Sequence, residues 1–231
     1  KIYNEYKENI KYFITKKTYI ITIIMLTILC YGFYITNFSV GVDDFSQDRY
    51  VTGTYLLSQG RWGNVLLARL LNFTTFVPFW TEFIATIFLV FTAILLSAFI
   101  RKEIGHIVDK TVYYVLFSGI LISYPVIHHI FLYNLTNLII GLNTLGMIVM
   151  AIIIYENTFN IKNKKIYFVI AIILPLFISM YEASCQVFLV FIFIAFFINI
   201  IKSNSVDKKK FQYILNSILV LAAGILINEL I

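Results

Sequence analysis

Charged residues and proline are both scarce in this chain of 231 residues. Asp, Glu, Lys and Arg together account for 13% of the sequence, only 3 residues are proline, and 60% of the residues are hydrophobic. A soluble domain needs roughly a quarter of its residues charged to cover its surface. The composition therefore excludes a soluble domain and indicates a protein that crosses a membrane several times.

Cysteine is scarce as well, and glycine-rich nucleotide motifs are missing. The two cysteines, Cys30 and Cys185, both lie in apolar runs. We interpret them as small buried hydrophobic residues and not as a disulfide or a metal site. The sequence contains no GxGxxG fingerprint, no phosphate loop and no internal repeat, which argues against a soluble nucleotide sugar or ATP as substrate.

Long apolar runs are what the sequence has in abundance. A bilayer core about 30 Å thick is crossed by a helix of about 20 residues, and several runs approach that length. We therefore predict an all-α polytopic membrane protein with about seven transmembrane helices. The predicted spans cover residues 19–38, 80–100, 112–127, 138–155, 166–180, 183–201 and 213–231.

The positive charges fall mostly on one side of these spans. Of the 18 Lys and Arg residues, all but Arg49, Arg61 and Arg69 lie before the first span or in the connections after the second, fourth and sixth. Short cytoplasmic loops retain positive charge, so we expect a cytoplasmic N-terminus and an external first loop. The net charge of +6 follows from this topology and gives no reason to expect a nucleic-acid partner.

The two ends of the sequence suggest a piece of a longer protein. The chain begins with Lys1, and the end of the sequence interrupts the last predicted span. We expect a single integral membrane domain over residues 1–231, with a C-terminal part missing. The first apolar run is too long for a cleavable signal peptide and lacks a small-residue cleavage site. The cytoplasmic connections RKEIGHIVDK, ENTFNIKNKK and KSNSVDKKK are interpreted as solvated connectors.

The external side carries a long first loop, residues 39–79, and a shorter second loop, residues 124–137. Long connections of this kind usually fold and carry function. In the first loop, apolar residues between Phe45 and Leu57 are spaced as in a helix that lies at the membrane interface. The segment QGRWGN then predicts a glycine-marked turn, and NVLLARLLNF predicts a second short apolar helix.

Three of the 12 acidic residues lie at the entrance to the first external loop: Asp43, Asp44 and Asp48. Asp43 or Asp44 is suited to cap the helix that begins near Phe45, because its carboxylate accepts hydrogen bonds from free backbone amides. The alternative is a catalytic base, which removes a proton from an acceptor hydroxyl while a sugar is transferred to it. The two roles are not exclusive, and the sequence leaves both open.

Arg49 and Arg61 favour the catalytic alternative. They are the nearest cations on an external side that has few others, and a guanidinium is suited to bidentate phosphate binding. A lipid phosphate leaves as a stable anion, so electrostatic stabilisation replaces the carboxylic acid with which a glycosidase protonates its leaving group. One base and one or two arginines therefore suffice for a lipid-phosphate sugar donor, and Asp48 is a further substrate-binding candidate beside them.

Two other external sites carry polar groups. Glu182 lies in a tight turn between spans five and six, where an ionisable residue either serves function or reaches water at the end of a span. Tyr181 beside it is a candidate stacking partner for a sugar. His128 and His129 in the second loop either line a substrate groove or belong to an ordinary interfacial loop. Adjacent histidines point in different directions on a helix, which does not favour a metal site.

Three segments together resemble the Gtr-type glucosyltransferases. The segments are GVDDFSQDRY, then SQGRWGNVLLARLL, then SMYEASCQVFLVFIF near the outer end of a later span. The resembled family consists of bacterial polytopic membrane enzymes that glucosylate O-antigen and similar surface polysaccharides. The resemblance extends over nearly the whole chain in order and spacing.

This resemblance implies a GT-C-like helical fold with a catalytic Asp in the first external loop. It also implies that glucose is taken from a polyprenyl-phosphate carrier on the outer face of the bacterial inner membrane. Where the family pattern has Gln, this sequence has Glu182, an anion that repels phosphate but can bind sugar hydroxyls. The residues that match family positions are Asp43, Asp44, Arg61, Trp62 and Tyr181.

The leading interpretation is therefore a membrane glycosyltransferase that moves a hexose from a polyprenyl-phosphate donor to a surface glycan. Its expected partners are donor, acceptor and membrane lipid. Asp43 and Asp44 offer oxygen ligands to a divalent cation, but no third ligand accompanies them, so we predict no metal and no cofactor.

The alternatives are a transporter or flippase for a lipid-linked sugar, and a non-catalytic assembly subunit. Transport is disfavoured because charged residues avoid the span centres and no repeated halves occur.

Overall fold

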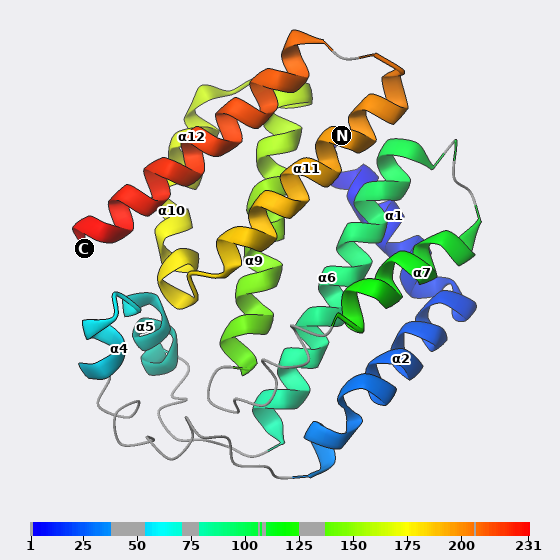
Figure 1. Ribbon diagram of the computed structural model, residues 1–231. Helices are drawn as coiled ribbons and strands as arrows, with labels where there is room; N and C mark the ends of the chain where they lie inside the picture. The colour runs from blue at the N-terminus through cyan, green and yellow to red at the C-terminus, as the bar shows by residue number, and fades with distance from the viewer. Residues whose placement is uncertain are drawn as a thin grey trace. The chain divides into compact units, whose positions relative to one another are not determined.

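The computed structural model describes residues 2–37, 54–70, 79–105, 107, 110–124, 137–205 and 207–231 (Figure 1). Helices, one of them a π-helical turn, account for all of the regular secondary structure in these ranges. They are α1 (Ile2–Thr15), α2 (Lys17–Thr36), α4 (Thr54–Ser58), α5 (Trp62–Leu70), α6 (Trp80–Ile104), α7 (Thr111–Ile122), α9 (Asn137–Glu156), the π-helical turn η2 (Asn157–Ile161), α10 (Lys164–Met180), α11 (Ser184–Ser203) and α12 (Lys208–Leu230).

The predicted class, an all-α polytopic membrane protein, is confirmed. Among the described residues, 5 helices are long and apolar enough to cross a membrane. They are α2, α6, α9 together with η2, α11 and α12. The other two predicted spans correspond to shorter helices: α7 has 12 residues and ends at Ile122, and α10 has 17 residues. The predicted span over residues 112–127 thus extends past the end of α7 into residues outside the described ranges.

The chain forms two compact units. The first contains residues 1–45 and 77–141, and the second contains residues 46–76 and 142–231. In the first unit, α2, α6 and α7 pack together around a hydroxyl cluster. The Tyr19 hydroxyl lies 2.8 Å from Oγ of Ser118 and 3.0 Å from Oγ of Ser97, and these two serine oxygens are 2.9 Å apart. Three buried hydroxyls therefore satisfy one another inside an otherwise apolar core.

Helix α1 packs against α6 in the first unit and was not predicted from the sequence. It is amphipathic, which suits a helix lying at a membrane surface. Its Phe13 is fully buried, and its ring centre lies 4.6 Å from that of Tyr19. Arg101 of α6 donates a 2.6 Å hydrogen bond to Asn9 and lies 3.8 Å from the centre of the Tyr12 ring. Apolar and cationic contacts together fix α1 to the end of α6.

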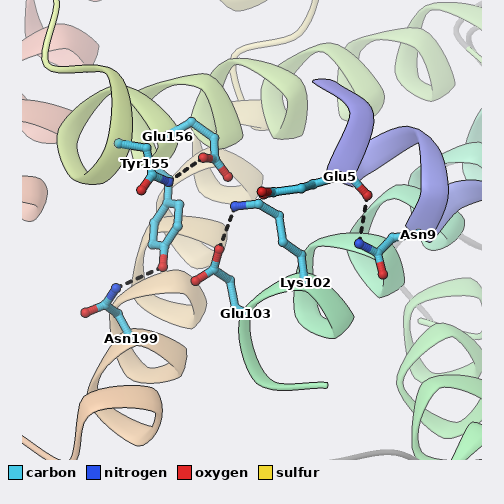
Figure 2. Close-up of polar contacts among 8 residues, drawn as sticks. Glu5, Asn9, Lys102, Glu103, Tyr155, Glu156 and Asn199 are labelled. Carbon is cyan, nitrogen blue, oxygen red and sulfur yellow. Dashed lines mark hydrogen bonds and ion pairs between the residues drawn. The ribbon is translucent and has the colours of Figure 1, made fainter. Parts of the chain in front are cut away.

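The second unit contains the parallel pair α10 and α12, with α11 beside α12 and the short helices α4 and α5 beside the C-terminal end of α10 (Figure 1). Apart from the adjacent pair Val220 and Leu221, the buried residues of α12 recur every three or four positions, as expected for one helix face. Gly224 permits the close approach, because a Cβ there would lie 3.1 Å from Cδ2 of Leu174. The Tyr155 hydroxyl of α9 accepts a 2.9 Å hydrogen bond from Asn199 of α11 (Figure 2).

All three connections that were predicted to be solvated are partly buried. In KSNSVDKKK, Lys210 is 1% exposed. In ENTFNIKNKK, Asn157 is fully buried and Thr158 is 7% exposed, because this segment forms η2 and packs against α12. In RKEIGHIVDK, Glu103 is 3% exposed and pairs with the Lys102 ammonium at 2.9 Å (Figure 2). The prediction was wrong for these residues because polar side chains that bond to one another can be buried in a helix end.

Candidate functional site

The predicted turn at QGRWGN brings Arg61 to the start of α5. Gly60 has a φ of 72°, which glycine adopts without the steric cost that a side chain brings, and the Arg61 backbone N–H donates to the Leu56 carbonyl at 2.8 Å. The turn is thus confirmed at Gly60 and Arg61, whereas Trp62 already belongs to α5. The second predicted loop helix is confirmed as α5 over Trp62–Leu70.

Gly63 packs α5 directly against the end of α10. Its backbone N–H donates a 3.0 Å hydrogen bond to Oγ of Ser179. A Cβ on Gly63 would collide with that same oxygen and would lie 2.5 Å from the carbonyl oxygen of Leu176. The absence of a side chain at position 63 therefore allows the contact that positions the neighbouring Arg61 and Trp62.

Trp62 joins α5 to α12. The indole N–H of Trp62 donates to Oδ1 of Asn228 at 3.0 Å, and Asn228 is 8% exposed. A buried amide oxygen needs a donor, and Trp62 supplies one across 166 positions of sequence. This bond gives Trp62 a positional role in addition to its predicted role in substrate binding.

Arg61 is the central group of the site. Its guanidinium carbon lies 5.9 Å from the centre of the Tyr181 ring, within the range of a cation–π contact. Its Nε is buried and has no hydrogen-bond partner, and no described residue forms an ion pair with Arg61. An unpartnered buried donor on a cation is costly, so this nitrogen is suited to an acceptor on a bound anion.

Tyr181 is held in place through its carbonyl oxygen. That oxygen accepts from the Ser184 hydroxyl at 2.6 Å, from the Ser184 backbone N–H at 3.0 Å and from Nδ2 of Asn143 at 3.4 Å. Asn143 is only 1% exposed, and its side-chain oxygen, Oδ1, is buried and has no hydrogen-bond partner. Near the end of α10, Asn143 thus offers a buried acceptor and Arg61 offers a buried donor, and neither group has a partner.

We refer to Arg61, Trp62, Asn143, Tyr181 and Asn228 as the Arg61 cluster. All five residues belong to the second unit. The cluster combines a guanidinium, two aromatic rings and a free amide oxygen. A guanidinium binds phosphate oxygens through paired N–H donors, and aromatic rings and amides suit the apolar faces and hydroxyls of a sugar. This arrangement has the chemistry to bind a sugar that is linked to a phosphate.

Glu182 lies in the turn between α10 and α11, as predicted. Its side chain is exposed, and its carbonyl oxygen accepts from the Cys185 backbone N–H at 3.0 Å. An exposed carboxylate at this place fits both alternatives, because it reaches water at a span end and is also accessible to a sugar. Glu182 forms no ion pair with Arg61, so it leaves the guanidinium available to another anion.

Several predicted site residues fall outside the described ranges. They are Asp43, Asp44, Asp48, Arg49, His128 and His129. Their proposed roles stay predictions. Within the described ranges, no group of three or more His, Cys, Asp or Glu residues comes together in a way that could hold a metal ion. Cys30 and Cys185 are both free, in α2 and α11.

Sequence analysis missed Glu82, Asn143, Ser179 and Asn228. Glu82 lies in the first turn of α6, is 1% exposed, and accepts a 3.0 Å hydrogen bond from the Thr81 hydroxyl. A signal for it exists in the sequence, because an acid inside an apolar run indicates a functional or paired residue. The other three are neutral polar residues within apolar helices, for which the sequence offers no comparable signal.

The described residues define an all-helical membrane protein that carries a polar, arginine-centred site at one end of its second unit. The model of the family described as Glucosyl transferase GtrII matches residues 32–231. Because this match covers most of the chain, the protein belongs to the GtrII glucosyl transferase family and is a glycosyltransferase. No curated protein and no solved structure matches the chain.

Proposed function

We propose that this enzyme transfers glucose from a polyprenyl-phosphate carrier to a surface polysaccharide such as O-antigen. Membership of the glucosyl transferase family supports the transferred group. The transmembrane helices support a donor that is itself a membrane lipid. The absence of nucleotide-binding motifs from the sequence favours a lipid phosphate over a soluble nucleotide sugar as the donor.

Arg61 is the observation that carries this proposal. Its Nε is buried without a partner, and its guanidinium lies against the Tyr181 ring. In the proposed complex, Arg61 binds the donor phosphate while Tyr181 and Trp62 contact the glucose. Glu182, which follows Tyr181 in the turn after α10, is exposed and is suited to bind sugar hydroxyls. Asp48, Arg49, His128 and His129 are proposed as further polar contacts to the substrates.

The proposed reaction needs one base and one anion-binding group. Asp44 or Asp43 takes the proton from an acceptor hydroxyl, and the acceptor oxygen forms a bond to C1 of glucose. The bond from C1 to the phosphate oxygen breaks, and polyprenyl phosphate leaves with the electron pair. Arg61 stabilises the negative charge on this leaving group, so no acid is needed to protonate it. The proposal requires neither a metal nor another cofactor.

The proposed location is the bacterial inner membrane, with the N-terminus in the cytoplasm and the active site on the external face. The distribution of Lys and Arg supports this orientation. The Arg61 cluster agrees with it, because α10 runs from its lysine-bearing start to Tyr181 at its other end. A GT-C-like arrangement, with the active site built on the first external loop, belongs to the same proposal.

Single substitutions of the two acids test this proposal. In cells that carry the acceptor polysaccharide, Asp43→Asn or Asp44→Asn should abolish glucosylation, since an amide cannot take the proton. Glu8→Gln, which makes the same change at an exposed position of α1, serves as the control and should leave glucosylation intact. Membrane insertion of each variant is checked by immunoblot of isolated membranes. Full glucosylation by both Asp variants would overturn the proposed base.

A further inference from the structure

The lysine-bearing end of the second unit contains a polar cavity that the glucosyl transfer does not use. It has a volume of about 620 Å³ and lies between η2, the start of α10 and the start of α12. Along α10, Tyr167 in its wall and Tyr181 in the Arg61 cluster are separated by about 21 Å, at 1.5 Å per helical residue. The cavity is therefore separate from the Arg61 cluster.

Three lysines line this cavity: Lys162 after η2, Lys164 at the start of α10 and Lys209 at the start of α12. Lys162 and Lys164 are exposed and form no ion pair with any described residue. The Lys209 ammonium donates a 3.1 Å hydrogen bond to the carbonyl oxygen of Phe159. The described lining includes no acidic residue. The cavity therefore has a net positive charge with no carboxylate to balance it.

The back wall of the cavity is held by neutral hydrogen bonds. The Tyr167 hydroxyl lies 2.7 Å from the hydroxyl of Thr158 and accepts from Nδ2 of Asn216 at 3.3 Å. Gln212, one helical turn before Asn216, is exposed at the mouth. These bonds join η2, α10 and α12, so the wall does not need the ligand in order to form.

The backbone that carries Lys162 is fixed as well. Lys162 has a φ of 60° and its N–H donates to the Asn157 carbonyl at 2.7 Å. The Asn157 side chain donates to the Asn163 carbonyl at 2.9 Å and accepts from the Asn163 N–H at 2.9 Å. A connection held by paired hydrogen bonds keeps the lysines near one another in the absence of a ligand, which lowers the entropic cost of binding.

Apolar side chains lie next to the polar lining along both helices. Phe168 lies one helical turn after Lys164 and is 69% exposed, and Leu215 lies one turn after Gln212 and is 57% exposed, so each shares a helix face with a lining residue. Such residues suit contact with lipid chains, whereas lysines at span ends suit the headgroup layer. The mouth of the cavity thus joins a cationic polar surface to a lipid-facing one.

We propose that this cavity binds the phosphate of an anionic phospholipid headgroup on the cytoplasmic side of the membrane. Lys162 and Lys164 bind the phosphate oxygens, Gln212 binds the polar part of the headgroup, and the acyl chains lie along Phe168 and Leu215. Basic pockets between transmembrane helices on this side are suited to anionic headgroups. A free phosphate has the same chemistry but gains nothing from the exposed apolar residues, which favours the lipid.

The test uses the full chain in phosphatidylcholine vesicles that contain a trace of spin-labelled phosphatidylglycerol. Electron paramagnetic resonance measures the fraction of label whose motion the protein restricts, relative to spin-labelled phosphatidylcholine. Lys162→Gln/Lys164→Gln removes two lining lysines. Lys165→Gln/Lys208→Gln removes two exposed lysines beside them that do not line the cavity, so the net charge changes equally. All four side chains are exposed, so both variants should fold.

We expect the unsubstituted chain to prefer phosphatidylglycerol, and the lining variant to lose about fivefold in preference for each lysine removed. The control variant should retain its preference to within about twofold, because its lysines act only through the screened surface field. Equal losses in the two variants, or no loss in the lining variant, would overturn the cavity as the site. Displacement of the label by millimolar inorganic phosphate would identify a soluble phosphate as the ligand and overturn the lipid assignment.

Discussion

The indole N–H of Trp62 donates a 3.0 Å hydrogen bond to the side-chain oxygen of Asn228, across 166 positions of sequence. This bond joins the start of α5 to the end of α12, and it lies next to Arg61, whose Nε is buried without a partner. The position of the arginine therefore depends on a helix that lies near the other end of the chain.

A double-mutant cycle measures the strength of this bond. Trp62→Phe and Asn228→Leu should show a coupling of about 1 kcal/mol in the free energy of unfolding, because they share one buried hydrogen bond. Unfolding is followed in mixed detergent micelles. Trp80→Phe combined with Asn228→Leu is the control, since Trp80 is 52% exposed and lies in the first unit. A coupling as small as in the control pair would contradict the inferred contact.

Arg61→Lys keeps the positive charge but removes the planar fork of N–H donors. We expect kcat/KM for the lipid-linked donor to fall about 10- to 100-fold, which corresponds to the loss of a charge-assisted hydrogen bond. Arg69→Lys is a matched control because Arg69 is exposed at the other end of the same helix, α5. Similar values of kcat/KM for Arg61→Lys and the unsubstituted enzyme would contradict the assignment of Arg61 to phosphate binding.

Gly63→Ala should displace α5 from α10. The added Cβ would collide with Oγ of Ser179 and lie 2.5 Å from the Leu176 carbonyl. Overpacking of this kind costs about 1–3 kcal/mol of stability, and we also expect loss of glucosyl transfer because Arg61 moves with the helix. In Gly32→Ala of α2 the nearest atom would lie 3.5 Å away, so stability should be unchanged or raised. Thermal unfolding and transfer assays measure both effects, and normal transfer by Gly63→Ala would contradict the positioning role.

Gly146→Ala tests the packing of α9 against α10. A Cβ at position 146 would collide with the Phe177 ring, whose Cδ1 would lie 2.6 Å away. The single variant should lose about 1–3 kcal/mol of unfolding free energy. Gly146→Ala/Phe177→Leu should recover most of this loss, since the smaller side chain leaves room for the methyl group. If the loss of stability in the double variant equals the sum of the losses in Gly146→Ala and Phe177→Leu alone, the Phe177 ring does not contact position 146.

The transmembrane helices were predictable because the length of an apolar run is a local property. The predicted span over residues 80–100 begins where α6 begins, at Trp80, and the predicted span over 166–180 ends where α10 ends, at Met180. Helix α1 contains no apolar run of membrane-spanning length, so the same criterion does not predict it. Its apolar residues Ile10 and Phe13 have the spacing of a helix face, and that pattern was available in the sequence.

The candidate site was predictable only in part. Arg61, Trp62 and Tyr181 were recognised individually, because charge at a membrane surface and aromatic residues at its interface carry a physical meaning. Their polar partners, Asn143 and Asn228, were not. A single asparagine in an apolar helix gives no indication of which other helix it faces, since that depends on how the helices pack.

Transfer by the purified, reconstituted enzyme tests the central claim most directly. The enzyme is supplied with polyprenyl-phosphate glucose that carries label in the sugar, together with the acceptor polysaccharide. We predict that label enters the polysaccharide and that an equal amount of free polyprenyl phosphate is released, with both products lost in Arg61→Ala. Label that stays on the lipid, whether in place or moved intact to the other leaflet, would contradict the claim.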